Sequence, residues 1–289
     1  MSPEFTPKDV ESLGRAETVY QEIITTQPRL AEIPQDQAKE LVARGLHEIS
    51  ELEEAAAANY IHPNITPDVA NNVKLLWDLS GPGTYDMPTK DDKYKDFPWA
   101  RNMDRARLNY TARLTKRIAE VKSGVDYNSG SLADVGERKE KTKKLIEEYG
   151  PTILYNGTGE ENATVEDVLG REGIIIPRSK VHVVGEGIAT TVDQVKDFKI
   201  PEGVSLDDSG EIGIISHAPH LMRTMHMINR YRPFPEGTKV RLFPLPTPDE
   251  GKDEYAMMEA RGLLYYTYMS PDKDTTPDAY PYTTLPKAQ

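Results

Sequence analysis

The sequence contains no cysteine, and this absence excludes disulfide bonds, thiolate metal sites and cysteine nucleophiles. It also lacks any apolar run near the roughly 18 residues that a membrane-spanning helix requires. The first segment, Met1–Val10, is polar and carries Glu4 and Asp9, which is not the pattern of a secretory signal. We therefore expect a cytoplasmic protein without a membrane span.

Positive charge is also scarce. The 289 residues include 35 Lys and Arg against 47 Asp and Glu, which gives a formal net charge of -12. A surface that binds nucleic acid must neutralise many phosphates, so this balance argues against nucleic acid as a partner. A local basic pocket for one small anion is still compatible with the acidic total. The hydrophobic content of 37% and the charged content of 28% are typical of a folded globular chain.

Residues 1–70 have a helical and polar pattern. Apolar residues recur at three- and four-residue steps between Leu41 and Leu52, and the alanine run Ala55–Ala58 follows. The triplet Thr66-Pro67-Asp68 is typical of a helix start with proline in the first turn. We expect a helical N-terminal extension that packs as a cap on a larger domain. A dimerisation or lid role is the alternative, and it makes these helices a candidate homo-oligomer interface.

Between residues 71 and 245, apolar runs of strand length alternate with helical stretches. The alternation indicates βαβ units and predicts a three-layer, doubly wound α/β domain with a mainly parallel sheet of about five strands. Right-handed crossovers would place the loops after the strands on one edge, where open α/β sheets bind ligands. The expected strands are Val73–Leu79, Thr152–Tyr155, Val181–Val184, Ile212–Ile215 and Val240–Phe243, and the expected helices are Ala100–Val121, Glu137–Tyr149, Thr164–Leu169, Thr191–Phe198 and Pro219–Tyr231.

The remaining stretch, 246–289, is rich in proline and tyrosine. We expect one helix there, between Asp253 and Tyr268, followed by an extended tail packed on the α/β domain. The chain is thus divided into an N-terminal extension, an α/β domain and a C-terminal helix with its tail.

Glycine-rich turns follow three of the expected strands. Gly81 and Gly83 follow the first strand, Asn156 and Gly157 open the second turn, and Glu186 lies between two glycines in the third. Glycine lets the backbone turn sharply and approach a ligand, and a helix N-terminus behind such a turn favours phosphate or carboxylate. None of the turns completes the dinucleotide-binding pattern, because the third glycine is missing. A plain tight turn is the alternative for each one alone, whereas their shared edge favours a cleft.

The clearest local motif joins the fourth expected strand to its helix. The strand is expected to end at Ser216 and the helix to begin near Pro219, with His217 at the turn. His220 and Arg223 are three residues apart and therefore share one face of the helix. Together they would pair a proton-transfer group near neutral pH with a cation that binds an oxyanion. Helix capping and surface ion pairs are the alternative interpretation.

Arg101 and Arg105 open the first long helix of the domain. Cations near a helix N-terminus are unfavourable without an anion, so both are candidate anion ligands, with salt bridges to nearby acidic residues as the alternative. We expect no metal site, and the sequence does not identify a cofactor. Acidic residues that would orient His220 or act as a general base lie at the neighbouring loops, namely Asp78, Asp86, Glu160, Glu161 and Glu186.

The order of these motifs extends from about Val73 to Pro244. The segments are Ser80-Gly81-Pro82-Gly83, Asn156-Gly157-Thr158-Gly159 with Glu160 or Glu161 behind it, Glu186 followed by Thr191-Val192-Asp193-Gln194, and Ser216-His217-Ala218-Pro219-His220-Leu221-Met222-Arg223. In this order they resemble the YdcF/SanA-like family, a bacterial domain of unknown function. The last segment is the most specific match. Asn156 stands where the family has serine, and Asp193 and Gln194 replace its Glu-Asn pair.

The resemblance implies a Rossmann-like domain whose polar cleft binds nucleotide-like or S-adenosylmethionine-like ligands or acts on envelope precursors. Our leading hypothesis is a protein that binds a small anionic or nucleotide-like molecule, and a candidate hydrolase or transferase for a phosphorylated compound. The alternatives are a non-catalytic ligand-sensing or protein-interaction module and an S-adenosylmethionine-binding protein. The expected catalytic residues are His220 for proton transfer, Arg223 as anion clamp and Glu186; the expected ligand-binding residues are Ser80, Gly81, Gly83, Arg101, Arg105, Asn156, Gly157, Glu161, Thr191, Gln194, Ser216 and His217.

Overall fold

The computed structural model describes residues 7–80, 99–100, 103–125, 135–159, 161–163, 165, 175–184, 188, 190–206, 210–269 and 280–286. Within these residues, six strands form one parallel sheet in the order β3-β2-β1-β4-β5-β6. The predicted doubly wound α/β fold is confirmed, and all five predicted strands are present. The strands are β1 (Val73–Leu79), β2 (Thr152–Asn156), β3 (Val181–Val183), β4 (Glu211–His217), β5 (Lys239–Leu245) and β6 (Tyr282–Thr284).

The sixth strand corrects the predicted number of about five. β6 is only three residues long and lies in the proline-rich tail, where no apolar run of strand length marks it. Its pairing with β5, from Val240↔Tyr282 to Leu242↔Thr284, defines the strand. A local pattern could not show it, because the residues that create it are about 40 positions upstream in the chain.

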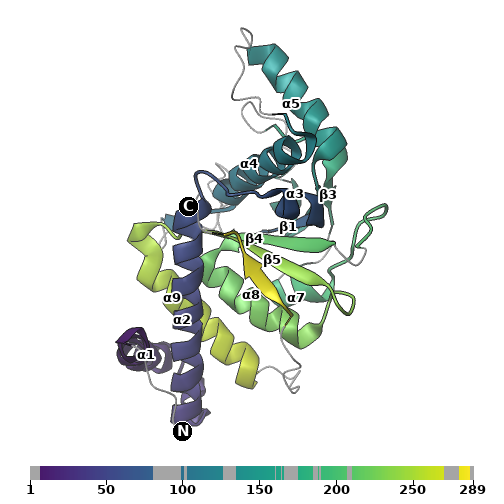
Figure 1. Cartoon of the computed structure of the whole chain (residues 1–289). Coiled ribbons are helices and arrows are strands. Elements are labelled where there is room, and N and C mark those ends of the chain that lie inside the picture. The colour runs from purple at the N-terminus through teal and green to yellow at the C-terminus, as the bar shows by residue number, and fades with distance from the viewer. Residues whose placement is uncertain are drawn as a thin grey trace.

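The central strands are apolar throughout because both faces of the sheet are covered by helices. Successive side chains of β1 point to opposite faces, so Leu75 and Trp77 join one hydrophobic cluster and Leu76 joins the other. Figure 1 shows the sheet between the two helical layers, with α4 and α5 above it and α8 and α9 below it. The upper layer holds α3 (Pro67–Asn72), α4 (Met103–Ser123) and α5 (Val135–Tyr149), and the lower layer holds α7 (Thr191–Lys196), α8 (Ala218–Tyr231) and α9 (Lys252–Leu264).

The N-terminal helices pack on the lower layer. They are α1 (Pro7–Thr26) and α2 (Gln35–Asn59), joined by the short helix η1 (Pro28–Glu32). Buried residues of α2 such as Val42 and Leu46 belong to the same hydrophobic cluster as Leu221 of α8 and Leu263 of α9. In Figure 1 the long α2 runs beside α9. This is the packing of a helical cap on the α/β domain.

Two helix starts are fixed by local side chains. Thr66 caps α3 by accepting a hydrogen bond from the Val69 N–H, with Pro67 in the first turn, as predicted. Thr190 caps α7 and forms a reciprocal capping box with Asp193. The predicted C-terminal helix is also present as α9, which continues into a π-helical turn over Tyr265–Met269. Short 3-10 turns precede β3 (Arg178–Lys180) and α9 (Asp249–Gly251), and of the predicted helix Thr164–Leu169 only Val165 is described.

The order of the strands determines where a ligand would bind. The chain moves outward from β1 to β3, returns to β4 beside β1, and then moves outward again to β6. The direction reverses between β1 and β4, and open α/β sheets bind ligands in the crevice at this point, at the carboxyl ends of the strands. No described helix has the length and apolar character needed to cross a membrane.

Candidate functional site

Side chains from four elements meet at the carboxyl edge beside the switch point. Ser80 follows β1, Asn156 ends β2, His217 ends β4, and Gln194 lies on α7. All four are buried. These residues are far apart in the chain. They meet because parallel strands end on the same edge of the sheet.

Ser80, Asn156 and Gln194 form one hydrogen-bonded unit. The Gln194 Nε2 donates to Ser80 Oγ at 2.5 Å and to the Asn156 carbonyl at 2.7 Å. The Asn156 amide donates in turn to the Gln194 carbonyl at 2.9 Å, and its Oδ1 accepts from Trp77 Nε1 at 2.7 Å. The three predicted residues are thus brought together. The side-chain amides of Asn156 and Gln194 hold this edge of the site in place through these hydrogen bonds.

The second turn is closed by its own side chains. The Gly157 N–H donates to Asn162 Oδ1 and the Thr158 N–H donates to Glu161 Oε2, each at 2.8 Å. A Cβ at Gly157 would lie 2.8 Å from the Glu161 Cβ and 2.9 Å from the Ser80 Cβ, so this position requires glycine. Glu161 therefore shapes the turn beside Ser80, in addition to its predicted role toward a ligand.

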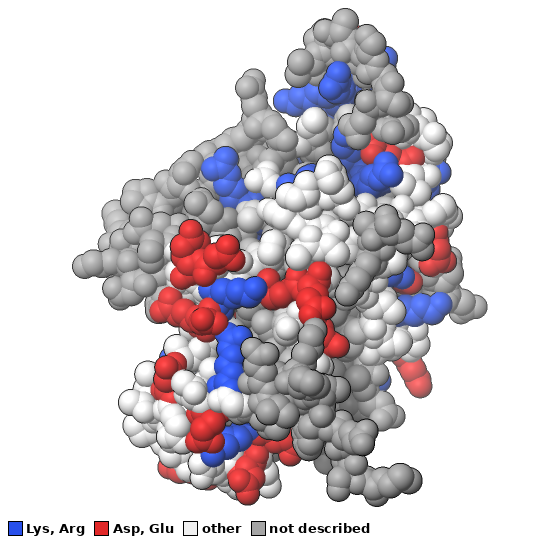
Figure 2. All heavy atoms as spheres, turned by 60° about the vertical axis from the view of Figure 1, so that its left-hand side comes forward, with Lys and Arg blue, Asp and Glu red and all other residues white. Residues whose placement is uncertain are grey.

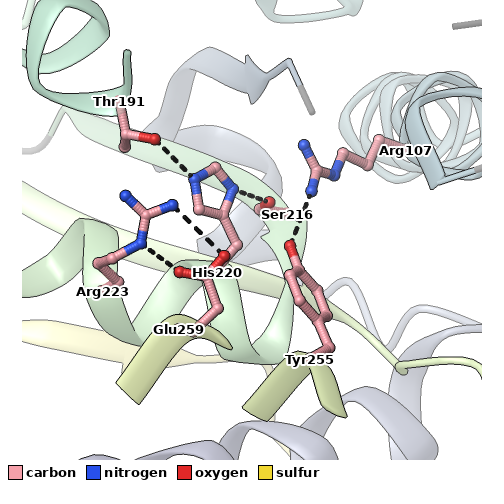
Figure 3. Close-up of polar contacts among 7 residues, drawn as sticks. All are labelled: Arg107, Thr191, Ser216, His220, Arg223, Tyr255 and Glu259. Carbon is pink, nitrogen blue, oxygen red and sulfur yellow. Dashed lines mark hydrogen bonds and ion pairs between the residues drawn. The ribbon is translucent and has the colours of Figure 1, made fainter. Parts of the chain in front are cut away.

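His220 lies between two hydroxyl groups, as Figure 3 shows. Its Nδ1 is 3.0 Å from Ser216 Oγ and its Nε2 is 3.2 Å from Thr191 Oγ1. Burial lowers the pKa of His220 well below its usual range, and the positive charges of Arg223 and Arg107 lower it further. The imidazole is therefore neutral at pH 7, which corrects the expectation of a group that changes charge near neutrality. A neutral ring between two hydroxyls can take a proton from one side and return one on the other.

Arg223 lies beside His220 and binds a carboxylate of α9 (Figure 3). Its guanidinium forms a two-pronged ion pair with Glu259, visible in Figure 3, and only 14% and 8% of the two side chains are exposed. The neighbouring Gly262 makes room for it, since a Cβ there would lie 2.8 Å from Arg223 Cδ. The charge of Arg223 is already compensated by Glu259. An anion that bound to Arg223, as predicted from the sequence, would have to compete with this carboxylate.

Arg107, which was not predicted from the sequence, is a fully buried cation at this edge. Arg107 lies on α4, is fully buried, and donates from Nη1 to the Leu79 carbonyl at 2.7 Å and from Nε to His217 Nδ1 at 3.1 Å. Its Nη2 donates to Tyr255 Oη at 3.5 Å (Figure 3). Within the described residues it forms no ion pair with a carboxylate. Arg105, the predicted ligand two residues earlier, is exposed, because a step of two residues turns a helix by about 200°.

The bond from Arg107 also fixes the protonation of His217. Because Nδ1 accepts a hydrogen bond, the ring proton must be on Nε2. Burial lowers the pKa of His217 well below its usual range, and the charge of Arg107 has the same effect. His217 is therefore a neutral donor at the end of β4.

Two buried carboxyl groups, Asp78 and Asp104, lie near Arg107; Asp78 was among the acidic candidates named from the sequence, whereas Asp104 was not. Asp78 accepts a hydrogen bond from Thr111 at 2.7 Å, and Asp104 accepts one from the Tyr155 hydroxyl at 2.9 Å. The Oδ1 atom of each is buried and has no hydrogen-bond partner among the residues that the structure describes. Burial raises the pKa of Asp78 to about 7 and that of Asp104 to about 8, although the charge of Arg107 opposes both shifts.

Four predicted site residues, Gly81, Gly83, Arg101 and Glu186, lie outside the described residues. The acidic candidates Asp86 and Glu160 also lie outside them. In the part of the chain that is described, no group of three or more His, Asp or Glu side chains is arranged to hold a metal ion.

No family model, curated protein or solved structure matches this chain. The resemblance to the YdcF/SanA-like family therefore stays a prediction, and the function has to be argued from the site alone.

Proposed function

We propose that this protein binds a small anionic molecule, phosphorylated or nucleotide-like, at the switch point between β1 and β4. The anion would sit at the N-terminus of α8, above the buried guanidinium of Arg107. Three features of that position support the proposal. The most important is that the charge of the buried Arg107 is only partly compensated.

Arg107 is a buried cation whose charge is only partly compensated. Transferring a guanidinium out of water is costly unless an opposite charge lies close by. Of the nearby carboxyls, Asp104 has a pKa of about 8 and is mostly protonated at pH 7, and Asp78 has a pKa of about 7 and is about half protonated. A bound anion would supply the missing charge.

The N-terminus of α8 is the second feature. Each of the helices α2, α3, α4, α5, α7 and α9 has an acidic residue in its first turn, whereas α8 has none. Its N-cap residue His217 makes no side-chain capping bond. A helix N-terminus without an acidic side chain favours an external anion.

The third feature is that the His220 ring contacts two hydroxyl groups, those of Ser216 and Thr191. Thr191 is half-buried, so its side chain can face a ligand while its Oγ1 contacts His220. Neutral His220 would accept a proton from a ligand hydroxyl or from Thr191, and Ser216 would hold the ring in place. This arrangement suits a transferase or hydrolase. In this proposal Arg107 takes the anion-binding role that the sequence analysis gave to Arg223.

Calorimetric titration tests the proposal with pyrophosphate, AMP and S-adenosylmethionine as probes. We expect the phosphate-bearing probes to bind the wild-type protein. In Arg107→Lys, which keeps the charge but loses the forked donors, affinity should fall by about tenfold or more. Arg44→Gln, at an exposed residue of α2 that pairs with Glu40, is the control and should bind as the wild type does.

Thr191→Val keeps the test decisive if Arg107→Lys does not fold. It removes one half-buried hydroxyl, and we expect several-fold weaker binding with an unchanged unfolding midpoint. Wild-type affinity in both variants, or no binding of any phosphate-bearing probe to the wild-type protein, would overturn the proposal. Phosphorus NMR of the bound probe over time then separates an enzyme from a binding protein.

A further inference from the structure

A second hollow lies away from the carboxyl edge, between α4 and the segment that joins α2 to α3. Its volume is about 370 Å³. The joining segment leads through α3 into the start of β1, at the opposite edge of the sheet from the switch point. The lining residues are Ile61–Pro63 from the joining segment and Arg113, Lys116, Arg117 and Glu120 from α4.

This hollow is separate from the site at Arg107. Its cationic residues follow Arg107 by six to ten positions on α4, which corresponds to about 9–15 Å along the helix axis. They also lie on other faces of α4, since Arg107 is fully buried and the hollow is open to solvent. A ligand here would not contact the switch point.

The lining is basic in an acidic protein. Figure 2 shows red acidic side chains gathered over the middle of one face, in keeping with the net charge of -12. In the hollow, two cations share one carboxylate: Lys116 Nζ lies 3.3 Å from Glu120 Oε1, and Arg117 Nη1 lies 3.4 Å from Glu120 Oε2. Glu120 itself is buried. Arg113 adds a third cation to the lining, so the described residues of the hollow carry more positive than negative charge.

Arg113 is held in place without a carboxylate partner. Its guanidinium stacks over Tyr60, 4.7 Å from the ring centroid, and lies 5.5 Å from the centroid of Tyr110. Nη2 donates to the Tyr60 carbonyl at 3.1 Å. Its Nε is buried and has no hydrogen-bond partner among the described residues. A guanidinium held in one orientation by ring stacking and a carbonyl hydrogen bond is preorganised for an anion.

The rim adds an apolar wall. Ile61 is 63% exposed, which is unusual for a large aliphatic side chain, and Pro63 lies beside it. Charge on one side and apolar surface on the other fit a ligand with an anionic head and an apolar body.

We propose that this hollow is a second ligand site, which takes a small molecule with a phosphate group attached to an apolar or aromatic body. Arg113 and the pair Lys116 and Arg117 would bind the phosphate, and Ile61 and Pro63 would contact the body.

Phenyl phosphate and inorganic phosphate are the probes, and the ring resonances of His62 provide a readout local to this hollow. Titration of the full chain should shift the His62 resonances with both probes, and phenyl phosphate should bind several-fold more tightly because it also contacts the apolar wall. Lys116→Gln and Arg117→Gln should each weaken binding several-fold. Lys143→Gln, on the exposed face of α5, is the matched control and should leave the affinity unchanged.

Glu120→Gln gives a change of opposite sign. It removes the carboxylate that competes for Lys116 and Arg117, so phenyl phosphate should bind more tightly, whereas damage to the fold would only weaken binding. Failure of phenyl phosphate to shift His62 in the wild-type protein, or unchanged affinity in Glu120→Gln and Lys116→Gln together, would overturn the proposal. Neither result would contradict the proposed anion site at Arg107, because that site is tested separately by the loss of binding in Arg107→Lys.

Discussion

At the scale of single residues, the two buried carboxyls make stability depend on pH. The unfolded chain releases their protons near the ordinary carboxyl pKa of 3.8, whereas the folded protein holds them until pKa values of about 7 for Asp78 and about 8 for Asp104. Between these values the folded state binds more protons than the unfolded state, so the free energy of unfolding falls as pH rises. The contribution is complete below about pH 4 and is lost by about pH 8.

Asp104→Asn should remove its share of this dependence. Asn has nearly the same shape, and its carbonyl oxygen can still accept the Tyr155 hydrogen bond, but it cannot ionise. We expect the variant to be more stable than the wild type at pH 9, on the order of a few kcal/mol, and by a clearly smaller margin at pH 5. Urea unfolding at both pH values measures the difference. Asp249→Asn, at an exposed carboxyl, is the control, and a wild-type pH profile in Asp104→Asn would contradict the assignment.

Single residues also show the limit of sequence reasoning at this site. Ser216, Thr191 and His220 could be placed together from the sequence, because each lies either just after a predicted strand or at the start of the helix that follows one, and these connections share an edge of the sheet. Arg107 could not be chosen over Arg105. Both arginines lie in the same polar stretch, and only the rotation of α4 about its axis decides which one is buried.

At the scale of elements, the turn after β2 depends on a glycine. Gly157→Ala would place a Cβ 2.8 Å from the Glu161 Cβ and 2.9 Å from the Ser80 Cβ. We expect a loss of about 1–3 kcal/mol in the free energy of unfolding, together with weaker anion binding, because the turn and Ser80 must move apart. Chemical denaturation and calorimetry measure the two effects.

Gly159 provides the matched control for this turn. An added Cβ there meets nothing within 4 Å. Gly159→Ala should therefore be neutral or slightly stabilising. Equal destabilisation by the two substitutions would show that general stiffening of the turn, and not the contact with Ser80, is responsible.

The elements themselves were largely predictable. β1, β2, β4 and β5 are continuous apolar runs because helices cover both faces, and such runs are visible in the sequence. β6 was not predictable, because its three residues become a strand only through pairing with β5. The same limit applies to the order of strands, since nothing local determines that β4 returns to the side of β1.

At the scale of the whole molecule, the N-terminal helices belong to the central core. α2 packs on α8 and α9 so closely that a Cβ at Gly45 would lie 3.2 Å from Leu263 Cδ2 and 3.4 Å from Met222 Cε. An interaction module that can be detached would not share its core in this way.

Removal of residues 1–60 should therefore destabilise the remaining chain strongly. The buried faces of α8 and α9 would be exposed to solvent, so we expect binding of a hydrophobic dye and a large loss in the temperature of unfolding. A truncated chain that unfolds at the wild-type temperature would show that these helices are an independent accessory segment.

The position of α2 has a consequence for biosynthesis. Its partners α8, β5 and α9 all begin after residue 217, so the helix is made long before the surfaces that cover it. At translation rates of about 5–20 residues per second, the apolar face of α2 waits for roughly 8–40 seconds after it leaves the ribosome. During that interval α2 can pack only on elements already made, such as α1, so its docking on α8, β5 and α9 would be a late step of folding.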